Sequence, residues 1–122
     1  NMSSMFSNCR ALTNLNLSSF DTSNVTDMNF MFFRCWALTN LDISSFDTKM
    51  VTDMRWMFDF CYSLTSLTLS NQFVICDEKE DMCYRLAFKA SSITITCTEA
   101  AKEALQDGTN LNNSKVTWNI IQ

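Results

Sequence analysis

Cysteines and aspartates recur at equal intervals along this chain and are the first candidates for chemistry. Cys9, Cys35 and Cys61 stand 26 residues apart. Thiolates bind zinc, but the chain has no histidine and no C-x-x-C pair, so the spacing does not indicate a metal site. We therefore expect no metal and no cofactor, and interpret these three cysteines as small apolar core residues.

The other three cysteines, Cys76, Cys83 and Cys97, fall outside this interval. Two interpretations stay open for them: unpaired core thiols, or a disulfide formed in an oxidising extracellular setting.

Paired carboxylates suggest general acid–base chemistry, and two such pairs are present, Asp21 with Asp47 and Asp27 with Asp53. Both pairs recur with the same 26-residue interval, so turn and helix-capping roles explain them more simply. The absence of histidine also removes the commonest general base. The sequence does not predict an enzyme.

The interval belongs to a repeat of 26 residues. The motif M-F-x-x-C starts at residues 5, 31 and 57, and the motif L-T-x-L-x-L/I starts at residues 12, 38 and 64. A fixed period of this length is typical of a solenoid, in which each repeat packs only on its neighbours. Solenoids mostly present extended binding surfaces.

One repeat predicts a strand, a loop and a helix. Leucines alternate with polar residues over 12–17, which is typical of a strand with one buried face. Met28, Met31, Phe32 and Cys35 are spaced as one apolar stripe of an α-helix. We therefore expect parallel strands at 12–17, 38–43, 64–69 and 92–96, and helices near 27–37 and 53–63.

Strands and helices need different spacings. Parallel strands lie about 4.8 Å apart and packed helices about 8–10 Å apart, so a stack of such units must curve. That helix spacing would also prevent disulfides among Cys9, Cys35 and Cys61, which we expect to be buried. The predicted fold class is α/β, a short leucine-rich-repeat solenoid with a parallel sheet on one side and helices on the other.

The repeat becomes irregular after residue 76. We assign residues 1–76 to about three repeats, the first of them truncated, and residues 77–122 to a degenerate last repeat and a C-terminal cap in the same domain. Helices are predicted at 81–90 and 99–105, the second capped by Thr98 and ended by Gly108. A last strand is predicted at 115–121.

Residues 1 to about 70 resemble the BspA-like leucine-rich repeats, the group once called DUF285. The motifs that carry the resemblance are L-D-I-S-S-F-D-T at 41–48, V-T-D-M at 51–54 and M-F at 57–58, followed by Cys61. This resemblance implies a secreted or wall-attached bacterial surface protein concerned with adhesion. The chain opens part-way through a repeat, so we interpret it as an excised C-terminal fragment.

Composition excludes several partners. The net charge is −4 and no basic stripe is present, which argues against nucleic acid. No apolar stretch approaches the roughly 20 residues that span a bilayer, so we expect no membrane insertion of this segment.

The positions that vary between repeats predict the binding surface. Ser4 becomes Phe30 and then Trp56, and similar changes bring further aromatic and arginine residues to the outward helix face. These residue types are enriched in interface hot spots. The predicted partner-binding residues are Phe30, Phe33, Arg34, Trp36, Arg55, Trp56, Phe60 and Tyr62. Five of them, Phe30, Trp36, Trp56, Phe60 and Tyr62, are expected to be substantially exposed, or buried only against another molecule. Intrachain packing of these rings, and contact with a second copy, stay open.

The sequence therefore predicts a non-catalytic recognition or adhesion module at the bacterial cell surface, with a protein partner or self-association. One alternative is a structural spacer or self-associating stalk. A second is glycan binding on the polar face of the sheet, along Asn14, Asn16, Asn40, Asp42, Ser66 and Thr68.

Overall fold

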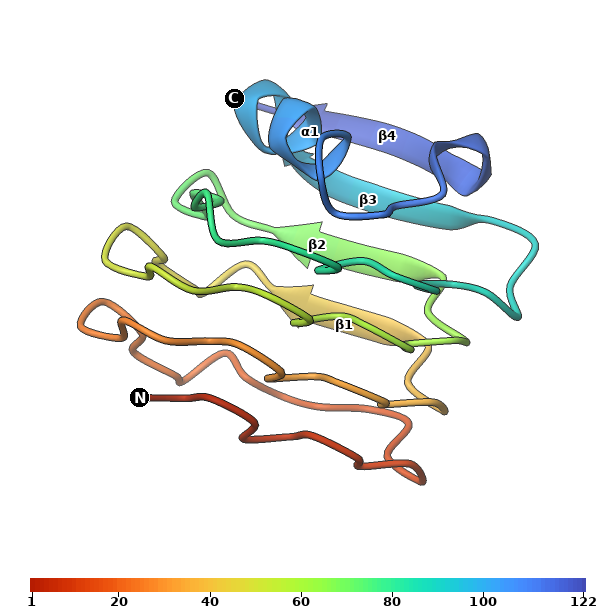
Figure 1. Ribbon diagram of the computed structural model, residues 1–122, viewed down its shortest axis with the longest axis horizontal. Coiled ribbons are helices and arrows are strands. Elements are labelled where there is room, and N and C mark those ends of the chain that lie inside the picture. Colours follow the sequence, from red (N-terminus) through yellow and green to blue (C-terminus); the bar gives the residue numbers. More distant parts are fainter.

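The computed structural model describes all residues, 1–122. Its centre is a parallel sheet of four strands in the order β1-β2-β3-β4. The strands are β1 (Asn40–Ile43), β2 (Ser66–Leu69), β3 (Ile93–Thr98) and β4 (Val116–Ile121). One α-helix, α1 (Glu99–Leu105), and one 3-10 helix, η1 (Asn113–Lys115), complete the elements. Figure 1 shows the chain winding through successive circuits, here called coils, which lie side by side from the N-terminus to the C-terminus.

The strands form where apolar and polar residues alternate. Leu41 pairs with Leu67, and Leu67 pairs with Ile95, so the inward side chains of neighbouring strands are in register. All three are fully buried. The strands predicted at 38–43, 64–69, 92–96 and 115–121 are confirmed, and their pairing is parallel.

The strand predicted at 12–17 is wrong. This segment has the same alternation, and Leu17 is buried, yet no backbone hydrogen bond joins it to β1. The one hydrogen bond across this gap is donated by the Ser45 hydroxyl to the carbonyl of Leu17, at 3.0 Å. A ladder of backbone hydrogen bonds is what defines a paired strand, so the sheet ends at β1.

The helices predicted near 27–37, 53–63 and 81–90 are also wrong: these segments are turns. Every second amide donates to a carbonyl of the next coil rather than to its own turn. The distances for the second coil are 2.9–3.1 Å, from Met28 to Asp53, Phe30 to Arg55, Phe32 to Met57 and Arg34 to Asp59. Equivalent bonds join the first coil to the second and the third to the fourth.

Local composition explains why no helix forms. Residues 29–36 are rich in Phe, Trp, Cys and Asn, which have low helix propensity. Stacked turns bury the predicted stripe as well as a helix would, because Met28, Met31, Phe32 and Cys35 are all fully buried. Both sides of the stack are then held by hydrogen bonds between coils. The reason given above for curvature, a wider helical side, therefore does not apply.

The turns depend on left-handed backbone at two positions in each coil. Phe30 and Trp56 have φ of 57°, and Arg34 and Phe60 have φ of 60° and 62°. Ser4 and Asn8 occupy the same two positions in the first coil, with φ of 60° and 63°. Left-handed backbone costs a non-glycine residue roughly 1–2 kcal/mol. The hydrogen bonds between coils are what compensate for this strain.

The core runs along the stack between the sheet and the turns. Phe6, Phe32 and Phe58 lie in equivalent positions, and their rings stack at centroid distances of 5.7 and 5.8 Å. Phe32 and Phe58 are fully buried, and 28 buried apolar residues form one continuous cluster.

The C-terminal end carries α1, which Figure 1 shows beside β3 and β4. The side chain of Thr98 accepts a hydrogen bond from the amide of Ala101 at 3.1 Å, which confirms the predicted cap. Gly108 has φ of 76°, as a left-handed residue after a helix requires. Neither helix is long or apolar enough to cross a membrane.

Candidate functional site

The aromatic residues that replace Ser4, Ser7, Asn8 and Arg10 of the first coil in later coils form one continuous surface. Phe30 stacks on Trp56 with 4.7 Å between ring centroids, and Trp36 stacks on Tyr62 at 5.8 Å. Phe60 contacts Phe33 and Tyr62 edge-on, at 5.7 and 5.6 Å. Two more rings extend the contacts into the fourth coil: Tyr84 against Phe60 and Phe88 against Tyr62. We call the set the aromatic surface: Phe30, Phe33, Trp36, Trp56, Phe60, Tyr62, Tyr84 and Phe88.

All eight residues predicted from the sequence lie on or beside this surface, but the expected exposure is wrong. Each of the eight is half-buried rather than exposed. The cause is the close spacing of the coils, which lets each ring cover its neighbour in the next coil. Only Tyr84 and Phe88, at 39% and 55% exposure, are largely open to solvent.

Several cations lie over these rings. Arg34 sits 5.0 Å from the centroid of Phe33 and 5.4 Å from that of Phe60. Arg10 lies 4.3 Å from Trp36, and Arg55 lies 5.2 Å from Trp56. Such cation–π contacts contribute roughly 0.5–1 kcal/mol each at exposed sites. They also hold these guanidinium groups close to the rings.

Sequence reasoning missed the part of the surface in the fourth coil. Arg85 lies over Tyr84 and Phe88, and Lys89 lies over Tyr62. The segment 81–90 was interpreted as a helix, which hid its place in the repeat. The signal available in the sequence was a shortened interval, since Met82 follows Met57 by 25 residues whereas Met57 follows Met31 by 26.

Asp59 is a buried carboxyl beneath this surface. It is only 3% exposed, and its Oδ1 atom has no hydrogen-bond partner. Burial raises the pKa of Asp59 to about 7, and the charge of Asp81 acts in the same direction. The charges of Arg34 and Arg85 and the amide of Phe60 oppose this rise. Trp36 has a similar feature, because its buried Nε1 also lacks a partner.

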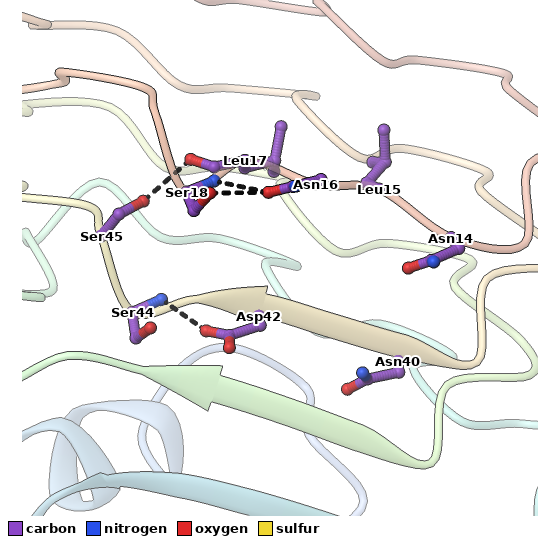
Figure 2. Close-up of a pocket in the computed structure, with 9 residues that line it drawn as sticks. All are labelled: Asn14, Leu15, Asn16, Leu17, Ser18, Asn40, Asp42, Ser44 and Ser45. Carbon is purple, nitrogen blue, oxygen red and sulfur yellow. Dashed lines mark hydrogen bonds between the residues drawn. The ribbon is translucent and has the colours of Figure 1, made fainter.

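A polar hollow of about 320 Å³ lies on the opposite side, between residues 14–18 and β1. Figure 2 shows Asn14, Asn40 and Asp42 along its two walls. Two of its side chains are held in local turns, since Asn16 accepts from Ser18 and Asp42 accepts from the amide of Ser44. The hollow exists because residues 12–17 do not pair with β1. The predicted polar residues Ser66 and Thr68 lie on β2, outside it.

All six cysteines are unpaired. Cys35 and Cys61 are fully buried, as predicted, but Cys9 is only half-buried, because no coil covers it on one side. The thiols of Cys35 and Cys61 donate to the carbonyls of Phe6 and Phe32 at 3.2 and 3.1 Å. Burial raises the pKa of Cys35 to about 12, so its nucleophilic thiolate form is suppressed. The helix spacing invoked above against disulfides does not apply, since the helices are absent.

No group of three or more Cys, Asp or Glu residues is arranged to hold a metal ion. The structure therefore offers two candidate sites, the aromatic surface and the polar hollow. The first is an extended face built by three coils, and the second is a small depression at the edge of the sheet.

The comparisons with known proteins give one match. A family model described as "Mycoplasma protein of unknown function, DUF285" matches residues 1–95, which is most of the chain. No curated protein and no solved structure matches.

Proposed function

This chain belongs to the DUF285 family, and we propose that it is a non-catalytic recognition module that binds a protein partner through its aromatic surface. The observation that carries the proposal is the unbroken contact of eight aromatic rings across three coils, in which Phe30 meets Phe33 edge-on at 5.0 Å and so joins the Trp56 pair to the rest. Arginines lie over these rings. Clusters of Trp, Tyr and Arg dominate the binding energy of many protein interfaces.

We further propose that the repeats build a leucine-rich-repeat solenoid of the BspA-like kind, with stacked turns in place of helices. Two features support this fold. The 26-residue motif recurs three times, and equivalent backbone hydrogen bonds join each coil to the next. On this proposal the segment 77–122 is the degenerate last repeat and cap.

The proposed location is the bacterial cell surface, with a role in adhesion to host or neighbouring cells. This part of the proposal rests on the resemblance of residues 41–65 to repeats of secreted surface proteins. A spacer or self-associating stalk is the competing proposal. Its weakness is that a spacer gains nothing from replacing Ser4 and Asn8 by Trp and Phe in later coils.

Glycan binding in the polar hollow is a second candidate function. Its specific support is the free amide groups of Asn14 and Asn40, which make no side-chain hydrogen bond and share one depression with Asp42. Amide and carboxylate groups can donate to and accept from sugar hydroxyls.

The test replaces two rings by the residues of the first coil, in the double variant Trp56→Ser, Phe60→Asn. Ser4 and Asn8 already hold the same left-handed backbone, so the fold should be retained. Loss of half-buried rings should cost less stability than the roughly 3–5 kcal/mol of a core phenylalanine. We expect adhesion of protein-coated beads to epithelial cells, and any self-association in sedimentation velocity, to weaken by ~2 kcal/mol or more, about 30-fold.

The matched control is Asn14→Ala, Asn40→Ala in the polar hollow. Trypsin treatment of the cells should abolish adhesion if the partner is a protein, whereas periodate should abolish it if the partner is a glycan. Unchanged adhesion of the ring variant, together with loss in the asparagine variant, would transfer the function to the hollow. If the ring variant unfolds, these aromatic residues belong to the core and the assignment is wrong.

A further inference from the structure

We propose that the partner bound by the aromatic surface is an acidic polypeptide segment, held by Arg10, Arg34, Arg85 and Lys89. This inference rests on the proposed function and adds the chemistry of the partner. It draws on three observations: the position of the cations, their lack of carboxylate partners, and the lack of a hollow on this surface.

The four cations gather on one face although the protein is acidic overall. Its net charge is −4, with nine Lys and Arg against 13 Asp and Glu. Each of the four lies over a ring of the aromatic surface, at 4.3–5.5 Å from a centroid. Arg10 comes from the first coil, Arg34 from the second, and Arg85 and Lys89 from the fourth, so the positive charge is spread along the stack. Lys115, which also lies near Phe88, is already held by the carbonyls of Ala87, Phe88 and Ala90.

None of these four cations has a carboxylate partner. The only ion pairs in the structure join Arg55 to Asp53 at 2.8 Å and to Glu78 at 3.7 Å. Those groups lie beside Trp56, at the opposite margin of the surface. Asp59 lies below the cations, but it is buried and its raised pKa favours the neutral form up to about pH 7. A second acid, Asp81, lies close enough to Asp59 to raise its pKa, and its carboxylate accepts a hydrogen bond from Asn110. Around Phe60, Tyr62 and Phe88 the three cations Arg34, Arg85 and Lys89 therefore stand against one partly exposed acid.

The shape favours a polypeptide over a small anion. The two hollows of the molecule lie elsewhere, one beside β1 and one between residues 71–75 and α1. A ligand on the aromatic surface must therefore lie along an open face rather than enter a cavity. An extended segment with carboxylates and apolar side chains would match the cations and the rings together.

The experiment uses a fluorescein-labelled dodecapeptide of alternating Glu and Tyr, measured by fluorescence anisotropy. Matched peptides carry Gln or Lys in place of every Glu. The variant Arg34→Gln, Arg85→Gln removes two cations of the face. The control variant Lys49→Gln, Lys102→Gln removes two charges elsewhere, and circular dichroism checks the fold of both.

We expect the Glu peptide to bind at least tenfold more tightly than the Gln peptide, and the Lys peptide not to bind. The affinity for the Glu peptide should fall tenfold or more in the arginine variant and less than threefold in the lysine variant. Binding should also weaken as the salt concentration rises from 50 to 300 mM. Equal losses in both variants, or equal binding of the Glu and Gln peptides, overturn the proposal. Tighter binding of dextran sulfate than of the Glu peptide would also overturn it, in favour of an anionic polysaccharide.

The two proposals fail in different ways. If Trp56→Ser, Phe60→Asn abolishes cell adhesion but the arginine variant adheres normally, the aromatic surface is a recognition site and the acidic partner is wrong. If neither variant changes adhesion, the recognition site itself is wrong.

Discussion

At the scale of single residues, Asp59 is the group whose chemistry depends most on the fold. Its carboxyl is buried among aromatic rings and left without a partner at Oδ1. The folded state therefore favours the protonated form, because burial raises the pKa to about 7. In the unfolded chain the pKa returns to about 3.9. The folded protein binds a proton that the unfolded chain releases, between roughly pH 4 and pH 7.

We predict that Asp59 makes the protein less stable as pH rises. The bound proton's contribution to the free energy of unfolding is fully present below about pH 4 and is lost as pH rises through about 7. Asp59→Asn should remove this pH dependence. The free energy of unfolding of the variant, relative to that of the native protein, should therefore be about 2–4 kcal/mol higher at pH 8 than at pH 4. Urea unfolding at both pH values measures it. Parallel pH profiles for the native protein and the variant would show that the carboxyl is solvated.

At the scale of elements, the stacked turns depend on residues with left-handed backbone. Ser4 tests this most simply, since its side chain is exposed and makes no hydrogen bond. We predict that Ser4→Gly stabilises the protein by about 1 kcal/mol, because glycine adopts this backbone without strain. Ser92→Gly, at a position without positive φ, should instead cost about 0.5–1 kcal/mol. Denaturation midpoints compare the two, and an equal loss in both would contradict the turn geometry.

The same elements show how far the sequence could be interpreted. The alternation around Leu41 and Leu67 correctly indicated strands, but alternation alone was not sufficient, because residues 12–17 alternate in the same way and do not pair with β1. The stripe from Met28 to Cys35 was not sufficient for a helix, since it specifies only which side chains face inward. Whether the amides donate hydrogen bonds within their own turn or to the next coil depends on the presence and position of that neighbouring coil. The eight predicted residues lie on or beside one surface, and the intrachain packing of their rings, which the sequence left open, is what the structure shows.

At the scale of the whole molecule, the two ends of the stack differ from its middle. Phe6, Cys9, Leu15 and Phe20 are partly buried, whereas their counterparts one repeat later, Phe32, Cys35, Leu41 and Phe46, are fully buried. Each coil contacts only its neighbours, so a coil covered on one side is held less firmly. Stability should therefore rise from the first coil to the second.

Hydrogen exchange should detect this gradient. We predict that the amides of Ser4, Phe6 and Asn8 exchange at least tenfold faster than those of Phe30, Phe32 and Arg34, although both sets donate to the next coil. Mass spectrometry of peptides covering 1–11 and 27–37 measures the difference. Equal protection of the two segments would mean that the stack opens only as a whole.

The hydrogen bonds that join the coils on both long sides give the molecule a constant unit of growth. Each coil adds about 4.8 Å to the stack, the spacing of bonded strands. A gene duplication of 26 codons would therefore insert one coil, extend each line of rings by one side chain and leave the older contacts in place. Recognition could then evolve by changing the number and order of coils, with each ring altered independently of the rest.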